Sequence, residues 1–290
     1  MTSLFDEAKF LQLPETTQHL LEFMSIIYAP VAATPLSKLS PVATDVKVLR
    51  PLLDELVKAK LLSVSKQGYY ACAENIRDAL TRRSLREGRF AALAKVVDIY
   101  MVPEQPKQWW YGQQIWPQAE AALRDLRLAV LSGKDKDLPQ LLQRARQQYQ
   151  NSPKFQPHPW FKLWGNPLDA AWLPFFPDST FLQLIAPPYL ALAEKEMGDA
   201  NAFWGHCLQR LQATTMDTAS LWEVFGTTYY GQLFLRGQWT DALAAQPPLA
   251  DGAVRLEQWY VFAAAQVLSR GKRDEAILTY QTGLKLMRKR

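Results

Sequence analysis

Cysteine and histidine are both scarce in this chain of 290 residues. The two cysteines, Cys72 and Cys207, lie far apart, so no disulfide framework is indicated and both are expected to be buried small apolar residues. The three histidines, His19, His158 and His206, lack the His/Cys/carboxylate spacing of a zinc site. We therefore expect neither a metal nor a cofactor.

Catalytic motifs and uninterrupted apolar runs are missing as well. The chain has no Gly-x-x-x-x-Gly-Lys-Ser/Thr phosphate loop and no Gly-x-Ser-x-Gly elbow, which indicates that it is not itself an enzyme. The longest apolar stretch, 170–193, is interrupted by Asp178 and several prolines, so no membrane span is expected. The N-terminus carries Asp6 and Glu7, unlike a secretory signal, and a cytoplasmic location follows.

What the chain does contain is enough apolar material for a core. Hydrophobic residues make up 48% of it and charged residues 21%, which excludes a disordered chain and indicates about two domains. The formal net charge is +5. A basic excess of this size is compatible with a nucleic acid or an acidic protein as partner.

Near the C-terminus two stretches repeat each other thirty-four residues apart. They are 235–242 (Leu-Arg-Gly-Gln-Trp-Thr-Asp-Ala) and 269–276 (Ser-Arg-Gly-Lys-Arg-Asp-Glu-Ala). This period is typical of tetratricopeptide-type helical hairpins, in which the glycine allows a sharp turn and the alanine allows close helix packing. Weaker turns of the same kind are expected at Gly133 and Gly198. The repeats favour a protein-binding scaffold.

The first hundred residues follow a different pattern. Apolar residues at helical spacing predict a helix over 14–28, and a short second helix is expected over 34–39. A third helix either starts near Arg50, with Pro51 in its first turn, or starts at Asp45 and kinks at the proline.

A β-hairpin is expected directly after the third helix. Its strands are 61–65 and 69–72, and it turns at Gly68. Three helices followed by a hairpin form the winged-helix arrangement, whose third helix can enter the major groove of DNA while the hairpin touches phosphate. The candidate DNA-binding residues are the cations of these two elements: Lys47, Arg50, Lys58 and Lys66.

The charge of this region argues against simple DNA reading. Residues 1–76 contain seven lysines and arginines against eight aspartates and glutamates, whereas phosphate neutralisation needs a positive face. A protein-contact or packing role for the winged helix is therefore the alternative.

An arginine-rich segment follows, in what we predict to be one long helix over 74–100. It either binds nucleic acid or an acidic partner, or forms a solvated face whose apolar side packs on the rest of the chain. The candidate residues are Arg77, Arg82, Arg83, Arg86 and Arg89.

Aromatic residues gather in two proline-rich segments, 103–116 and 153–177. Exposed rings there would form a stacking platform for bases or a groove for a peptide. The interpretation that we favour is that the rings fill the irregular gaps between proline-bent segments.

The order of these elements resembles the N-terminal, non-motor region of large bacterial Swi/Snf-type DEAD/DEAH-box helicases. The segment 277–290 (Ile-Leu-Thr-Tyr-Gln-Thr-Gly-Leu-Lys-Leu-Met-Arg-Lys-Arg) is similar to the family's YxxALKxLRKR segment, which leads toward the helicase core, although Gly283 stands where the family more often has alanine. Residues 49–56 also look like the third-helix segment there. The resemblance implies that ATP hydrolysis and translocation belong to a motor after residue 290.

We therefore expect a mostly α-helical protein that acts as a non-catalytic binding and regulatory module. Its predicted parts are a winged-helix-like domain (1–75), a basic linker helix (76–102) and a tetratricopeptide-like helical-repeat domain (103–290). Its expected partners are a protein bound by the repeats and DNA. Two alternatives remain: the sensor half of a signal-transduction ATPase of the maltose-regulator type, and a free-standing adaptor.

Overall fold

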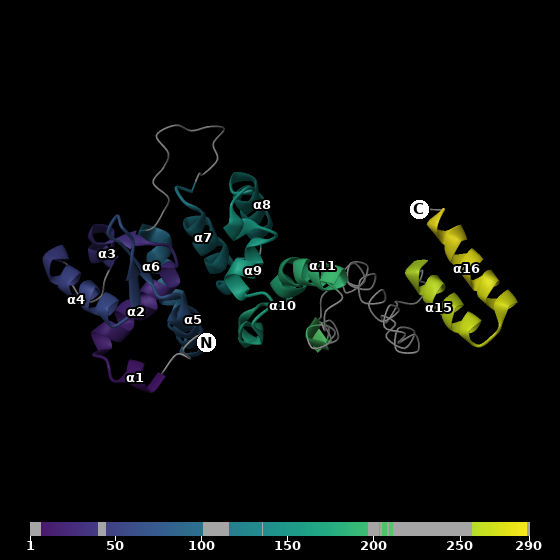
Figure 1. The fold of residues 1–290 in the computed structure, drawn as a ribbon, viewed down its shortest axis with the longest axis horizontal. Coiled ribbons are helices and arrows are strands. Elements are labelled where there is room, and N and C mark those ends of the chain that lie inside the picture. The colour runs from purple at the N-terminus through teal and green to yellow at the C-terminus, as the bar shows by residue number, and fades with distance from the viewer. Residues whose placement is uncertain are drawn as a thin grey trace. The chain divides into compact units, whose positions relative to one another are not determined.

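The computed structural model describes residues 7–39, 45–100, 116–134, 136–196, 203, 205–207, 209–210 and 257–288, and these are mostly helical (Figure 1). The chain divides into two compact units, Met1–Pro177 and Asp178–Arg290. The domain boundaries predicted at residues 75 and 102 both fall inside the first unit. No helix of the described part is long and apolar enough to cross a bilayer.

Most of the described helices belong to the first unit. Their bounds are α1 (Glu7–Leu11), α2 (Glu15–Ile27), α3 (Ala33–Leu39), α4 (Val46–Lys58), α5 (Glu74–Arg86), α6 (Phe90–Tyr100), α7 (Ala119–Leu131), α8 (Leu138–Gln148) and α9 (Pro159–Trp164). Two short 3-10 turns complete the helical set: η1 (Pro153–Phe155) and η2 (Ala170–Phe175).

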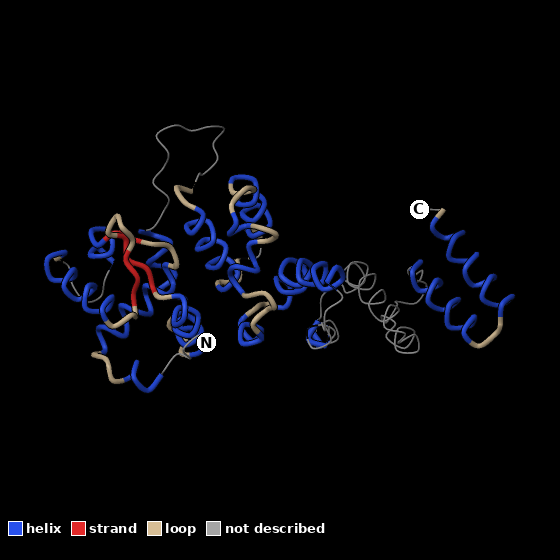
Figure 2. Tube along the Cα trace, viewed as in Figure 1, coloured by secondary structure: helices blue, strands red, loops and turns tan. Residues whose placement is uncertain are grey.

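Three short strands form the sheet of this unit, drawn in red in Figure 2. They are β1 (Val31–Ala32), β2 (Leu62–Val64) and β3 (Tyr69–Cys72), and β3 lies between the other two, antiparallel to both. The predicted hairpin is confirmed, with Gly68 at φ 78° and its N–H donating to the Ser65 carbonyl at 3.0 Å. The two-residue strand β1 was not predicted, because so short a segment carries no periodic signal.

The observed first residue of α4 decides between the two starting points predicted for this helix. It begins at Val46, and the Asp45 carboxylate accepts a hydrogen bond of 2.8 Å from the Lys47 N–H, as an N-cap does. Pro51 therefore lies inside the helix, where it withholds an N–H from the ladder of hydrogen bonds. The later start near Arg50 is wrong, since the aspartate cap already satisfies a backbone donor one turn earlier.

The single long helix predicted over 74–100 is also wrong. It is two helices, because α5 ends at Arg86 and Gly88 takes the left-handed conformation, with φ 71°. The Gly88 N–H donates to the Leu85 carbonyl at 3.2 Å and the Arg89 N–H to the Ser84 carbonyl at 2.9 Å, the pattern of a Schellman helix end. Both α5 and α6 pack against α2.

The core of the first unit centres on α2, which contacts the sheet, α5, α6 and α7. Because partners surround it, its buried residues run almost continuously along the helix instead of forming one stripe. Cys72 is buried here, and Cys207 is buried in the second unit, as predicted.

The second unit ends in a helical hairpin. Its described elements are α10 (Asp178–Thr180), η3 (Phe181–Ile185), α11 (Ala186–Glu196), α15 (Glu257–Ser269) and α16 (Arg273–Met287). The chain turns between α15 and α16 at Gly271, with φ 76°, and the small residues Ala264 and Ala276 are buried there. This hairpin and the turn at Gly133 are confirmed; the repeat copy at 235–242 and the turn at Gly198 lie outside the described residues.

Candidate nucleic-acid interface

The exposed surface of α4 carries three of the four cations predicted to touch DNA. Leu49, Leu53 and Leu56 are buried and fix the inward face of the helix. At 100° per residue Lys47 and Lys58 fall on the opposite face, with Asp54 beside them, and Arg50 falls on the flank, about 90° from the leucines; Lys47, Arg50 and Lys58 are all exposed. The leucines thus hold these three cations toward solvent.

A hydrogen bond joins the β2–β3 hairpin to the same helix. The Tyr70 hydroxyl donates to Asp54 Oδ1 at 2.9 Å, and burial, together with this bond, raises the pKa of Tyr70. Arg50 lies close enough to lower that pKa in part. Val64 pairs with Tyr70 across the hairpin, and Lys66 is exposed in the turn that follows Val64. The hydrogen bond thus joins the hairpin to α4, and the exposed residues of these two elements are together called the edge formed by α4 and the hairpin.

The four predicted DNA-binding cations are available for a ligand. Within the described part of the chain Lys47, Arg50, Lys58 and Lys66 are exposed and none of them takes part in an ion pair. Between residues 45 and 72 five lysines and arginines stand against three carboxylates. The edge formed by α4 and the hairpin is therefore positive.

The slight excess of acidic over basic residues in 1–76 does not represent the charge at this edge. Glu22 is buried and pairs with Arg89, and Glu74 lies 3.0 Å from the Lys162 ammonium. Both partners come from outside residues 1–76, so two of the eight acidic charges are compensated elsewhere in the unit. A count along the sequence cannot include such pairs.

The arginines of α5 behave differently from the α4 set. The Arg77 guanidinium carbon lies 4.1 Å from the centroid of the Tyr28 ring. Arg82 Nη1 lies 2.7 Å from Asp169 Oδ2, and its guanidinium is 5.0 Å from the Trp172 ring centroid. Both side chains are thus directed at partners within the first unit, where cation–π contact and ion pairing hold them.

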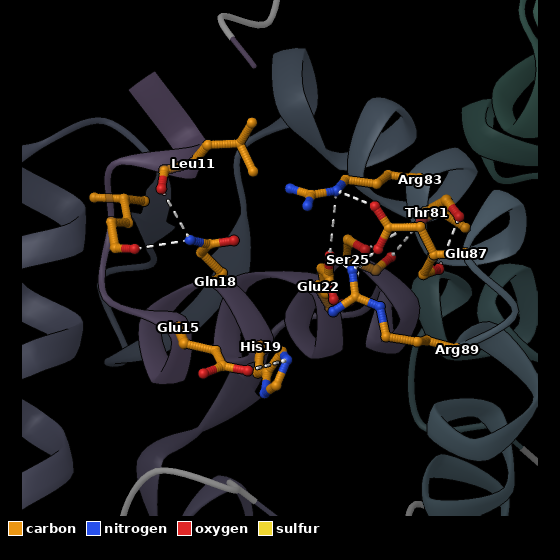
Figure 3. Close-up of polar contacts among 12 residues, drawn as sticks. Leu11, Glu15, Gln18, His19, Glu22, Ser25, Thr81, Arg83, Glu87 and Arg89 are labelled. Atoms are coloured by element: carbon orange, nitrogen blue, oxygen red, sulfur yellow. Dashed lines mark hydrogen bonds and ion pairs between the residues drawn. The ribbon is translucent and has the colours of Figure 1, made fainter. Parts of the chain in front are cut away.

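Arg83 and Arg89 surround the buried carboxylate of Glu22, whose side chain is 1% exposed (Figure 3). Glu22 Oε1 lies 2.6 Å from Arg89 Nη2 and 4.0 Å from Arg83 Nε, and both arginines also contact Glu87. Burial raises the pKa of Glu22 even though the two arginines lower it in part. These contacts fasten α5 and the Gly88 turn to α2.

Arg86 is the one arginine of the predicted set that is exposed, and it makes no ion pair with any described residue. Four of the five arginines thus contact acidic or aromatic groups inside the first unit. Sequence reasoning placed all five on one helix but had no means of locating their partners, since Glu22 and Asp169 lie far from α5 in the sequence.

Arg127, which the sequence reasoning missed, has a side chain only 2% exposed and is buried more deeply than Arg77, Arg82, Arg83 or Arg89. Its Nη2 donates to Asp78 Oδ1 at 2.9 Å, and its guanidinium carbon lies 5.2 Å from the Tyr28 ring and 5.0 Å from the Trp172 ring. The available signal was its place among the apolar residues of 121–131, because a charge on an apolar helix face needs a buried partner.

The described tryptophans of the two aromatic segments pack inside the protein, which confirms the packing interpretation for them. The four side chains are almost fully buried: Trp116, Trp160, Trp164 and Trp172. The rings of Trp164 and Trp172 meet edge to face, with centroids 5.0 Å apart. The tryptophans at 109 and 110 lie outside the described residues.

Among the described residues no three His, Cys, Asp or Glu side chains gather as metal ligands would. Comparison with known proteins adds no relative: no family model, no curated protein and no solved structure matches the chain.

Proposed function

We propose that this chain is a non-catalytic module that binds duplex DNA through the edge formed by α4 and the β2–β3 hairpin. The observation that carries the proposal is that Lys47, Arg50, Lys58 and Lys66 are exposed on this edge without an ion pair among the described residues. Cations held this way neutralise phosphates and release counterions, which supplies most of the free energy of non-specific DNA binding.

The element order supports a winged helix as the fold that presents this edge. The order α2, β1, α3, α4, β2, β3, with β3 between the other strands, is the one in which a third helix and a hairpin lie beside each other. The hydrogen bond between Tyr70 and Asp54 favours the same use, since it holds the hairpin against α4.

The α15–α16 hairpin supports a second role, as part of a tetratricopeptide-like surface for a protein partner. Hairpins of this kind stack into binding surfaces, and here Leu278 and Tyr280 are exposed on α16. The sequence resemblance then favours a module that positions a Swi/Snf-type motor on DNA or recruits its partners. The motor would supply ATP hydrolysis.

Salt-dependent binding tests the DNA proposal. A fluorescently labelled duplex of about 20 base pairs is titrated with the whole chain between about 50 and 200 mM salt, where phosphate contacts weaken steeply. Four phosphate contacts predict that log Kobs falls against log[salt] with a slope of about −3.6. Replacing the four cations of the edge by alanine should bring the slope close to zero.

A matched control removes the same number of charges elsewhere in the first unit. It replaces four other exposed cations by alanine: Arg86, Lys95, Lys136 and Arg144. This control should bind with the slope of the wild type. If the wild type does not bind DNA at about 50 mM salt, or if both variants lose binding equally, the edge is not a DNA interface and protein contact is the better account.

A further inference from the structure

The arginine–aromatic cluster of the first unit shares no residue with the proposed DNA-binding edge and has no role in the proposed function. It joins five elements through the following residues: Tyr28, Arg77, Asp78, Arg127, Trp164 and Trp172. Three aromatic rings lie within 5.9 Å of the Arg127 guanidinium carbon. Arg77 and Arg127 thus contact aromatic rings as well as the Asp78 carboxylate.

Hydrogen-bond donors in this cluster outnumber acceptors. Six buried polar atoms make no hydrogen bond within the described part of the chain: Tyr28 Oη, Arg77 Nε, Arg127 Nε, Arg127 Nη1, Trp164 Nε1 and Trp172 Nε1. Every one of them can donate a hydrogen bond, and all but the tyrosine hydroxyl can only donate. A buried donor without an acceptor costs the free energy of removing it from water, so this set favours a ligand with several acceptor atoms.

The charge of the cluster points to the sign of that ligand. Arg77 and Arg127 share the carboxylate of Asp78, at 3.9 Å and 2.9 Å, whereas the neighbouring Arg82 has Asp169 to itself. One positive charge is therefore left without a counter-charge among the described residues. Water would supply acceptors but no charge, whereas an oxyanion supplies both, and guanidinium groups bind oxyanions with two parallel hydrogen bonds.

The backbone at Tyr28 is strained in a way that places its ring in this cluster. Tyr28 has φ 60° and ψ −45°, and the Ala29 N–H donates to the Ile27 carbonyl at 2.5 Å, which makes a γ-turn. Non-glycine residues rarely adopt this conformation, and such strained positions gather at ligand-binding sites. The turn brings the Tyr28 ring against both Arg77 and Arg127.

One edge of the cluster reaches solvent. The Asp78 side chain is 36% exposed, while that of Arg127 behind it is 2% exposed. The Arg77 side chain is 11% exposed, and both arginines contact the same Asp78 oxygen. We propose that this edge, formed by Arg77, Asp78 and Arg127 with the Tyr28 hydroxyl, binds a small inorganic oxyanion of the phosphate or sulfate class.

The test measures the thermal stability of the whole chain against inorganic phosphate, with sodium chloride added to keep the ionic strength constant. Specific binding to the folded state should raise Tm with a saturable dependence on phosphate concentration, as ligand linkage requires. Sulfate should act in the same way and chloride should not. Tryptophan fluorescence gives a second readout, because Trp164 and Trp172 lie in the cluster.

Two variants locate the binding site. Asp78→Asn removes the carboxylate that competes with the oxyanion, so it should lower Tm without phosphate and bind phosphate about tenfold more tightly, the scale on which close charge pairs act. Tyr28→Phe removes only a hydroxyl, and one lost neutral hydrogen bond should weaken binding about 3- to 10-fold.

The matched control is Asp98→Asn, a carboxylate on α6 that pairs with Lys134 and is not a member of the cluster, and it should respond to phosphate as the wild type does. The proposal is overturned if the wild type and Tyr28→Phe show no saturable rise in Tm. It is equally overturned if phosphate stabilises Asp78→Asn, Tyr28→Phe and wild type alike, because phosphate then binds somewhere else.

Discussion

Glu22 Oε1 lies 2.6 Å from Arg89 Nη2, and this pair joins the middle of α2 to the turn after α5 with the carboxylate removed from water. Removing one partner of a buried pair leaves the other without compensation. We expect Glu22→Ala to lower the free energy of unfolding by about 3 kcal/mol, and Glu22→Gln, which keeps an acceptor for Arg89, to cost much less. Urea unfolding of the two variants beside the wild type measures both values.

The raised pKa of Glu22 predicts how the stability of the fold depends on pH. Burial raises the pKa of Glu22 above 4.5, so the folded state holds its proton more tightly than the unfolded state does. Its contribution to stability is complete below pH 4.5 and declines as pH rises through the raised value. Glutamine does not titrate, so the stability of Glu22→Gln relative to the wild type should increase with pH across that window. A decrease would contradict the assignment.

His158 predicts the opposite dependence of stability on pH. Burial, with a smaller effect of Arg146, lowers its pKa to about 4, so the folded state keeps the ring neutral where the unfolded state is protonated. Stability should therefore fall as pH drops from about 6.5 to about 4, by about 3 kcal/mol in total. His158→Asn keeps an acceptor for the Trp160 N–H, which now bonds Nδ1 at 3.3 Å, and should remove this dependence. Urea titrations of both proteins at pH 4.5 and pH 7 measure it.

Tyr70→Phe removes the hydrogen bond between the hairpin and α4 without changing any charge. Loss of the hydrogen bond to Asp54 should lower the free energy of unfolding by about 1 kcal/mol. DNA affinity should fall because the hairpin is held less firmly, while the salt slope stays at the wild-type value because the cations are intact. A changed slope would show that Tyr70 affects the number of phosphate contacts rather than their placement.

Gly88→Ala and Gly271→Ala test the two helix ends. Each glycine has a positive φ and open space where a Cβ would lie, so the cost is conformational and about 1 kcal/mol. Gly205, which is helical and exposed, is the matched control, because alanine there should stabilise by about 0.5–1 kcal/mol. Thermal unfolding measures all three. Equal effects would mean that the backbone conformation at these positions is not left-handed.

Turns could be predicted from the sequence where one residue type determines the local backbone conformation. Gly271 and Gly133 each follow a helical pattern that stops, so their turns were predictable. Gly88 was missed because the apolar positions on both sides of it continue a helical period, and one glycine within such a pattern is not decisive. The start of α4 remained open for a similar reason, since Pro51 fits either a first turn or a kinked interior.

The candidate sites were predictable only where exposure follows from helix geometry. Lys47 and Lys58 lie opposite the buried leucines of α4, so their outward direction follows from the period of the helix, whereas Arg50 lies on the flank of the helix. Arg82 pairs with Asp169, and Arg127 pairs with Asp78. These partners could not be predicted, because no local sequence pattern relates residues so distant along the chain.

The separations of these pairs matter for how the first unit folds. Arg127 meets Asp78 across 49 residues, Arg89 meets Glu22 across 67, and Arg82 meets Asp169 across 87. Each pair gains its favourable energy only after the long loop between its members has closed, which raises contact order and slows folding. A chain cut at residue 75 would keep Glu22 but lose its partner Arg89. A chain cut at residue 102 would keep Asp78 and Arg82 but lose their partners Arg127 and Asp169. The first unit is therefore expected to unfold in one cooperative transition and not in separate pieces.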